Sequence, residues 1–303
     1  MDDRYQVIEC VGGGSYADVY KVLDTLTGKI VAKKVLKDPL PANMKRFKRE
    51  RDMLAAYRTN PYVIDLLDSN LDAPEPYLIL EFSEIGSLQQ YVANRRAWKQ
   101  VLRWIRDIAL ALGPIHARGD WHRDIKPNNI LLFRNLSGRV IAKITDFGLA
   151  QRIDNSSGEM TDSPYGTKGY IDPIAEFFNK YTWHSDIYSL GKTLKELLTG
   201  DKDNGIYPND VPVQLRVLIS RMMSFTRNAR PSAENIVKSA NNLLRPQQPI
   251  QVQQIQPMGW KGLLTLAGAS LGILIALTNT NSYDENVGRY RDSNGRFRSG
   301  MFF

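Results

Sequence analysis

The chain has 303 residues, of which 43% are apolar and 24% charged, so it can bury one large core or two smaller ones and is not disordered over its whole length. Its single cysteine, Cys10, excludes an internal disulfide framework, and its three scattered histidines do not predict a zinc site. The formal charge of +8 suits a nucleotide phosphate, nucleic acid or anionic lipid as partner, but many soluble enzymes are as basic, so charge alone decides nothing.

The first part of the chain predicts an antiparallel sheet followed by one helix. Its acidic start, Met-Asp-Asp-Arg, is unlike a signal peptide, so we expect the first residues to belong to the fold. From Tyr5 to about Lys37, short β-branched stretches are broken by glycine clusters, as in strands joined by tight turns. Residues 43–57 lack Pro and Gly and are rich in Lys, Arg, Glu, Met and Leu, which predicts a helix.

The remainder of the folded region is predicted to be mainly helical. Tyr77 to Phe82 indicates one further buried strand, and Ser87 to Arg118 indicates a helical stretch that Gly113-Pro114 interrupts. Helical patterns then continue to about Leu244, apart from two short strand-like pieces.

Three adjacent glycines, Gly12, Gly13 and Gly14, lie between the first two expected strands. The run Val11-Gly-Gly-Gly-Ser-Tyr-Ala-Asp-Val19 resembles the loop that covers ATP phosphates in protein kinases, although Ala17 stands where a third glycine is usual. Glycine is needed there because a side chain would hold the backbone N–H groups away from the phosphate oxygens. Taken alone, adjacent glycines more often make a plain hairpin turn.

A lysine and a glutamate follow at the spacing of the same family. The run Val31-Ala-Lys-Lys34 matches the strand motif whose lysine holds the α- and β-phosphates, and Ala32 is included in the expected nucleotide site. Alignment on Val31-Ala32 selects Lys34, and strand alternation then turns Lys33 to the opposite face. Glu50, in the helix that follows, is expected to form the family's ion pair with this lysine. Taken alone, Glu50 would be read as a solvated helical charge.

The most specific block is His122-Arg-Asp-Ile-Lys-Pro-Asn-Asn-Ile-Leu-Leu132, which resembles the catalytic loop of protein kinases. The resemblance implies that Asp124 accepts the proton of the substrate hydroxyl and that Lys126 steadies charge on the transferred phosphate. It also implies that Asn129 holds a magnesium ion, whereas His122 braces the loop. Lys126 favours serine and threonine as acceptors, because tyrosine kinases generally lack lysine there.

The motif Asp146-Phe-Gly148 follows a strand-like stretch. The resemblance implies that Asp146 chelates magnesium between the β- and γ-phosphates, and that Phe147 packs against the glutamate-bearing helix. In the next loop we expect autophosphorylation within Ser156 to Ser163, with Thr161 as first choice. The reason is that the arginine before the catalytic aspartate commonly receives a phosphorylated residue in this family.

The run Gly166-Thr-Lys-Gly-Tyr-Ile-Asp-Pro173 resembles the substrate platform of the family. Thr167 is then expected to contact the catalytic aspartate and lysine, as is typical of serine/threonine kinases. Asp186, in the next predicted helix, matches the aspartate that ties down the backbone of the catalytic loop.

The platform departs from the family at its end, where Ala and Glu are replaced by Asp172 and Ile174. That glutamate normally pairs with a buried arginine, which would be Arg230 here. An unpaired buried arginine costs on the order of 3 to 5 kcal/mol, so we expect a substitute acid. Glu176 is the nearest candidate.

The resemblance spans about Tyr5 to Leu244 and implies a bilobal protein kinase fold of the α+β class. We expect a small β-rich lobe over residues 1–82 and a larger, mainly helical lobe over residues 83–245, with residues 1–245 as the kinase domain. The adenine of ATP would bind the main chain between the lobes, around Glu81 to Ser83.

The expected activity is transfer of the ATP γ-phosphate to serine or threonine hydroxyls of protein substrates, with Mg²⁺ as the metal and Mn²⁺ as the alternative. A pseudokinase or scaffold that binds nucleotide and partners without efficient transfer is the alternative, because a fold does not prove an activity. The residues needed for transfer are all present, which favours an active enzyme. They are Lys34, Glu50, Asp124, Asn129 and Asp146.

A different composition begins after the kinase-like region. Residues 246–259 are rich in Gln and Pro and predict a linker. Residues 260–278 predict a transmembrane helix, because Gly262 to Thr278 carries no charge and would span roughly 26 Å of a hydrocarbon core about 30 Å thick. A buried or partner-packing helix is the alternative. The kinase lobes would then face the cytosol, where ATP is available.

Two weaker expectations concern partners of this C-terminal region. Gly268-x-x-x-Gly272 would permit close pairing of two such helices, so a homodimer is as probable as a monomer. Residues 279–303 interleave arginines with aromatic residues, a pattern that suits phosphate backbones or anionic headgroups. A solvated basic tail is the simpler interpretation, and we do not expect nucleic acid as the main partner.

Overall fold

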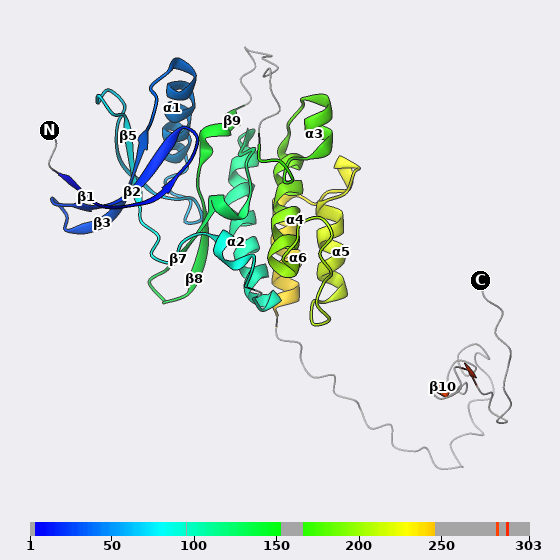
Figure 1. The fold of residues 1–303 in the computed structure, drawn as a ribbon. Helices are drawn as coiled ribbons and strands as arrows, with labels where there is room; N and C mark the ends of the chain where they lie inside the picture. The colour runs from blue at the N-terminus through cyan, green and yellow to red at the C-terminus, as the bar shows by residue number, and fades with distance from the viewer. Residues whose placement is uncertain (1–3, 95, 153–165, 246–282, 285–288, 291–303) are drawn as a thin grey trace. The chain divides into compact units, whose positions relative to one another are not determined.

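The computed structural model has a β-rich sheet in the N-terminal part of the chain and packed helices in the C-terminal part, consistent with a kinase fold (Figure 1). The chain divides into two compact units, Met1–Pro246 and Gln247–Phe303. Of the second unit the structure describes one antiparallel pair, β10 (Tyr283–Asp284) and β11 (Arg289–Tyr290). The described residues are 4–94, 96–152, 166–245, 283–284 and 289–290.

Five antiparallel strands form the N-terminal sheet in the order β1-β2-β3-β5-β4. Gly28 has a φ of 68°, which glycine adopts without steric cost, and it closes the turn between β2 and β3. The register of these two strands pairs Val19 with Lys34. The strands are β1 (Tyr5–Gly13), β2 (Ala17–Asp24), β3 (Lys29–Leu36), β4 (Leu66–Asn70) and β5 (Tyr77–Glu81).

The helix α1 (Pro41–Ala56) packs against β3 and β4, which confirms the helix predicted over residues 43–57. Proline suits the first helical position because its missing N–H would have no helical partner there. Phe47, Glu50 and Leu54 share one face of α1 and are completely buried. A carboxylate within an apolar stripe is costly unless it has a partner, so the fold itself singles out Glu50.

Helices build the C-terminal part, together with a short hairpin of β7 (Ile130–Arg134) and β8 (Val140–Ile144) that confirms the two predicted strand-like pieces. A second small pair joins β6 (Asp120–Trp121) to β9 (Gln151–Arg152). The helices are α2 (Trp98–Ala117), α3 (Pro173–Phe178), α4 (Trp183–Thr199), α5 (Val213–Met222) and α6 (Ala233–Leu244). Single 3-10 turns are η1 (Leu88–Tyr91), η2 (Pro127–Asn129), η3 (Phe147–Leu149) and η4 (Arg227–Ala229).

The helical stretch predicted over Ser87 to Arg118 is confirmed in part. Its first residues form the 3-10 turn η1, in which Leu88 is buried, and the α-helix itself begins at Trp98. The interruption predicted at Gly113-Pro114 is wrong, since α2 continues through Pro114 to Ala117. Pro114 lies in the last turn, where burial of Leu112 and Ile115 outweighs the lost backbone hydrogen bond.

One continuous core joins the two parts of the first unit. Buried side chains of the sheet and α1, such as Leu36 and Phe47, belong to the same apolar cluster as Ile108 of α2 and Leu194 of α4. Phe147 of η3 is completely buried within this cluster, and η3 contacts α1. The segment that carries the Asp-Phe-Gly motif is therefore fixed between the sheet side and the helical side.

Within the described residues, no helix combines the length and the apolar character that crossing a membrane requires. The stretch Gly262 to Thr278, predicted to be transmembrane, lies outside those residues, as do the whole of the linker and most of the tail.

Candidate active site

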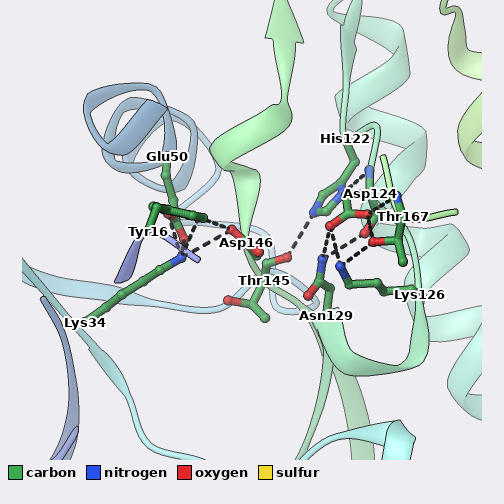
Figure 2. A network of polar contacts seen from close by, with 10 residues as sticks. All are labelled: Tyr16, Lys34, Glu50, His122, Asp124, Lys126, Asn129, Thr145, Asp146 and Thr167. Carbon is green, nitrogen blue, oxygen red and sulfur yellow. Dashed lines mark hydrogen bonds and ion pairs between the residues drawn. The ribbon is translucent and has the colours of Figure 1, made fainter. Parts of the chain in front are cut away.

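A buried ion pair joins the sheet to α1. Lys34 Nζ lies 2.7 Å from Glu50 Oε1 and 2.8 Å from Oε2 (Figure 2). As expected from strand alternation, Lys33 lies on the other face of β3, with its Nζ 4.5 Å from the ring centroid of Tyr77. The pair that the sequence resemblance implied is thus formed. Glu50 is not a solvated helical charge, because none of its side chain is exposed.

Asp146 extends this pair toward the catalytic loop. Its Oδ1 lies 3.2 Å from Lys34 Nζ. Burial tends to raise the pKa of Asp146, but the charge of Lys34 and a hydrogen bond from Tyr16 outweigh it and hold that pKa well below its usual range. Burial likewise tends to lower the pKa of Lys34, but Asp146 and Glu50 outweigh it and raise that pKa, so the ammonium stays charged.

The residue that sequence reasoning missed is Tyr16, which follows the three glycines. Its hydroxyl donates a hydrogen bond to Asp146 Oδ1 at 2.7 Å and accepts one from Lys34 Nζ at 3.1 Å (Figure 2). An aromatic residue in a glycine-rich turn would ordinarily be interpreted as a side chain over the sheet surface. The sequence signal was therefore only its position between the glycines and the second strand.

The catalytic-loop residues form a second cluster. Lys126 Nζ lies 2.7 Å from Asp124 Oδ2, and Asn129 Nδ2 donates to the same oxygen at 2.9 Å. The hydroxyl of Thr167 donates to Asp124 Oδ1 at 2.7 Å and accepts from Lys126 Nζ at 2.5 Å (Figure 2). The contact predicted between Thr167 and the catalytic pair is thereby confirmed, and both oxygens of Asp124 are held in place.

Asp186 of α4 fixes the backbone of this loop, as predicted. Its carboxylate accepts hydrogen bonds from the backbone N–H of His122 at 2.9 Å and of Arg123 at 2.8 Å. Arg123 has a φ of 71°, a strained value for a residue with a side chain, and these bonds hold it there. His122 is fully buried and its ring lies 3.0 Å from the carbonyl of Thr145, so it braces the loop.

The donor set fits a hard divalent cation that arrives with phosphate. Asn129 uses its Nδ2 on Asp124, and within the described residues its Oδ1 accepts no hydrogen bond. Oδ2 of Asp146 likewise accepts no hydrogen bond from a described residue. The backbone N–H of Thr145 donates to the carbonyl of Asn129 at 3.0 Å and so connects the segment of Asp146 to that of Asn129. No cluster of three acidic, His or Cys ligands for a metal occurs in the described part of the chain. Two oxygen ligands plus phosphates is how magnesium is commonly held.

Glu81 and Ser83 lie in the segment that connects the sheet to the helical part, and their side chains contact other residues of the protein. Lys143 Nζ lies 2.5 Å from Glu81 Oε1, and the Ser83 hydroxyl donates to the carbonyl of Leu132 at 2.6 Å. These contacts fix the end of β5. Ala32 is buried and Val19 is half-buried against the core, and Ala32 pairs with Leu80 of β5.

The acid that pairs with Arg230 is Asp172, so the expectation of Glu176 is wrong. Arg230 Nη1 lies 2.7 Å from Asp172 Oδ2, and Nη2 lies 2.8 Å from Oδ1. Asp172 is buried and also caps α3 by accepting from the backbone N–H of Ile174 at 3.1 Å. Glu176 is exposed on α3. An acid directly before a helix-starting proline is an N-cap signature, and that signal could have identified Asp172.

The pKa of Asp172 is governed by its contact with Arg230. Burial tends to raise the pKa of Asp172, but hydrogen bonds from Arg230 and its positive charge outweigh it and lower that pKa. The platform before it is held by Tyr170, whose hydroxyl donates to Glu196 and whose carbonyl accepts from the Ser189 hydroxyl at 2.8 Å. The segment from Thr167 to Asp172 is thus fixed at both ends and in the middle.

This fold and this pair of clusters agree with a comparison against protein families. The model of the protein kinase domain matches residues 5–241. The chain therefore belongs to the protein kinase domain family, which implies the use of ATP.

Several bacterial serine/threonine-protein kinases are similar to this chain. It is 34% identical over 204 residues to probable serine/threonine-protein kinase PknB of Lactococcus lactis, which covers 65% of this chain and 32% of that protein. It is 30% identical over 249 residues to serine/threonine-protein kinase PrkC of Bacillus subtilis, covering 80% and 37%. A probable serine/threonine-protein kinase of Clostridium perfringens is 29% identical over 249 residues, covering 80% and 35%. The chain thus spans about a third of the length of these curated relatives.

Proposed function

We propose that this chain is an active kinase that transfers the ATP γ-phosphate to serine or threonine hydroxyls of proteins. The observation that carries the proposal is the assembled pair of clusters, Lys34 with Glu50 and Asp146 on one side, and Asp124 with Asn129 on the other (Figure 2). A chain that had lost the activity would be expected to lack at least one of these groups.

The surroundings of Gly12 and Gly14 favour a ligand that lies close to their backbone. A Cβ on Gly12 would meet nothing within 4 Å, and one on Gly14 would meet only the carbonyl of Ala17 at 3.9 Å. Packing among the described residues therefore does not require glycine at either position. A phosphate that approaches the backbone closely does require it, which favours the nucleotide loop over a plain hairpin turn.

Asp124 would prepare the substrate hydroxyl that accepts the phosphate. Its carboxylate would orient the substrate hydroxyl and accept its proton, while the hydroxyl oxygen attacks the γ-phosphorus and the bond to the β-phosphate oxygen breaks. Lys126 would stabilise the negative charge on the transferred group. Asn129 and Asp146 would hold magnesium, which supplies positive charge against the phosphates.

The test is phosphoryl transfer by the purified full-length chain. With labelled ATP and magnesium, we expect phosphoserine and phosphothreonine on a general protein substrate and no phosphotyrosine. Asp124→Asn is the matched control, because it keeps the shape of the side chain and removes its charge. A wild-type protein that binds ATP but labels no protein would favour the pseudokinase alternative.

We propose that phosphorylation between Ser156 and Ser163 regulates the kinase, with Thr161 as first choice. This segment lies outside the described residues, and the support is the arginine that precedes Asp124. The same labelled protein, mapped by mass spectrometry, tests the proposal: an active enzyme with an unmodified segment contradicts it.

We propose further that residues 260–278 anchor the kinase to a membrane. The full-length chain should then sediment with membranes and resist extraction by high salt and by alkaline carbonate, because apolar burial does not weaken when charges are screened. A chain that ends at residue 257 is the matched control and should be released. Carbonate release of the full-length chain would show that the span is not inserted.

A further inference from the structure

Tyr16 occupies the position that the proposed function assigns to phosphate and metal. Its hydroxyl lies 2.7 Å from Asp146 Oδ1, 3.1 Å from Lys34 Nζ and 3.4 Å from Glu50 Oε2 (Figure 2). A Cβ added to Gly148 would lie 2.8 Å from this hydroxyl. The tip of Tyr16 therefore fills the space beside the Asp-Phe-Gly turn.

The ring of Tyr16 lies beside two cationic side chains. The guanidinium of Arg46 on α1 lies 4.4 Å from the ring centroid, and Lys34 Nζ lies 5.1 Å from it. Burial raises the pKa of Tyr16, and the charges of Glu50 and Asp146 raise it further. The hydroxyl therefore keeps its proton and acts as a donor toward Asp146.

Lys34 has no donor left for another ligand in this arrangement. An ammonium group has three N–H bonds, and their acceptors here are the two oxygens of Glu50, the hydroxyl of Tyr16 and Oδ1 of Asp146. A phosphate oxygen can bind Lys34 only by replacing one of them. Glu50 is completely buried, and Asp146 is the group that the proposed function assigns to the metal, so Tyr16, at the end of a glycine-rich turn, is the partner that can leave.

We propose that Tyr16 is a specificity-determining residue of the nucleotide site. Its hydroxyl binds Lys34 and Asp146 in place of a phosphate and a metal, and only a ligand with a polyphosphate displaces it. The inference rests on the proposed function, because it takes Lys34 and Asp146 as the groups that bind phosphate and metal. A nucleotide with β- and γ-phosphates replaces the hydroxyl at Lys34, and its metal replaces it at Asp146. A nucleoside without phosphates binds with Tyr16 still in place.

The displacement lowers the apparent affinity for ATP. ATP must break the hydrogen bonds of the hydroxyl to two charged groups, and solvation of the released hydroxyl compensates for part of that loss, so we expect the dissociation constant of ATP to be raised about fivefold. Adenosine displaces nothing at Lys34, so its dissociation constant carries no such penalty.

The experiment compares magnesium-ATP and adenosine binding to the full-length chain by calorimetry. Tyr16→Phe, which keeps the ring over the site and removes the hydroxyl, should bind magnesium-ATP about fivefold more tightly and adenosine unchanged. Tyr20→Phe is the matched control, because Tyr20 lies on the neighbouring strand and its hydroxyl makes no hydrogen bond to a described residue. It should bind both ligands as the wild type does.

Two results would overturn the inference. One is that Tyr16→Phe binds magnesium-ATP no more tightly than the wild type does. The other is that Tyr16→Phe also binds adenosine about fivefold more tightly, which would mean that the substitution makes the whole nucleotide site more accessible. Tyr16→Leu, which keeps apolar bulk, serves if Tyr16→Phe does not fold. Binding is measured without phosphoryl transfer, so a wild-type chain that binds ATP yet transfers nothing refutes the proposed function and leaves this comparison intact.

Discussion

Asp146→Asn should lower phosphoryl transfer by about a thousandfold or more while leaving the chain folded. An asparagine cannot balance the charge of a divalent cation, although it nearly preserves the shape of the side chain. The fold should tolerate it, because Lys34 keeps both oxygens of Glu50 as partners at 2.7 and 2.8 Å, and 30% of the Asp146 side chain is already exposed. Initial rates over a magnesium titration, together with a thermal unfolding curve, measure both parts of this result.

Asp52→Asn is the matched control for that loss of charge. Asp52 is an exposed residue of α1 that pairs with its neighbour Arg51, so its replacement should leave the rates unchanged. Near-normal turnover of Asp146→Asn with unchanged magnesium dependence would remove Asp146 from the proposed metal site.

Asp172→Ala should lower the free energy of unfolding by about 3–5 kcal/mol, because it leaves the guanidinium of Arg230 buried without its carboxylate. Neither side chain of this pair is exposed, and the same change removes the cap of α3. The loss should also raise the KM for a protein substrate more than the KM for ATP, since Asp172 ends the platform that begins at Thr167. Denaturant titration and steady-state kinetics measure the two effects.

A double variant tests whether the carboxylate that pairs with Arg230 must stand at position 172. Asp172→Ala combined with Ile174→Glu restores the arrangement usual in the family, and it should recover most of the lost stability because a carboxylate again reaches Arg230. Glu176→Gln is the control and should unfold like the wild type, since Glu176 is exposed. Wild-type stability of Asp172→Ala alone would show that the ion pair does not stabilise the platform.

Short motifs predicted much of the site because each of them combines a residue type with a fixed local geometry. Alignment on Val31-Ala32 selected Lys34, strand alternation placed Lys33 on the opposite face, and the resemblance assigned Glu50 to the ion pair that the structure contains. The contact of Asp186 with the catalytic loop followed from the resemblance, and the structure has it at 2.8–2.9 Å.

The residues that were missed depend on how segments distant in sequence approach one another. Asp172 and Glu176 lie near each other along the chain, and only the extended backbone before Pro173 decides which one faces Arg230. Tyr16 reaches Asp146 across 130 positions of sequence, and nothing in its neighbours indicates that contact. Packing across α2 likewise overrode the expectation that Gly113-Pro114 ends a helix.

The shared apolar cluster makes the sheet and the helices parts of a single structural module. Phe47 from α1, Phe147 from η3 and Ile108 from α2 belong to one cluster of buried side chains, and Met1–Pro246 is one compact unit. The segment around Glu81 therefore connects two parts of one domain and is not a linker between two domains. Exchange of the sheet with that of another kinase would have to preserve this shared interior as well as the two polar clusters.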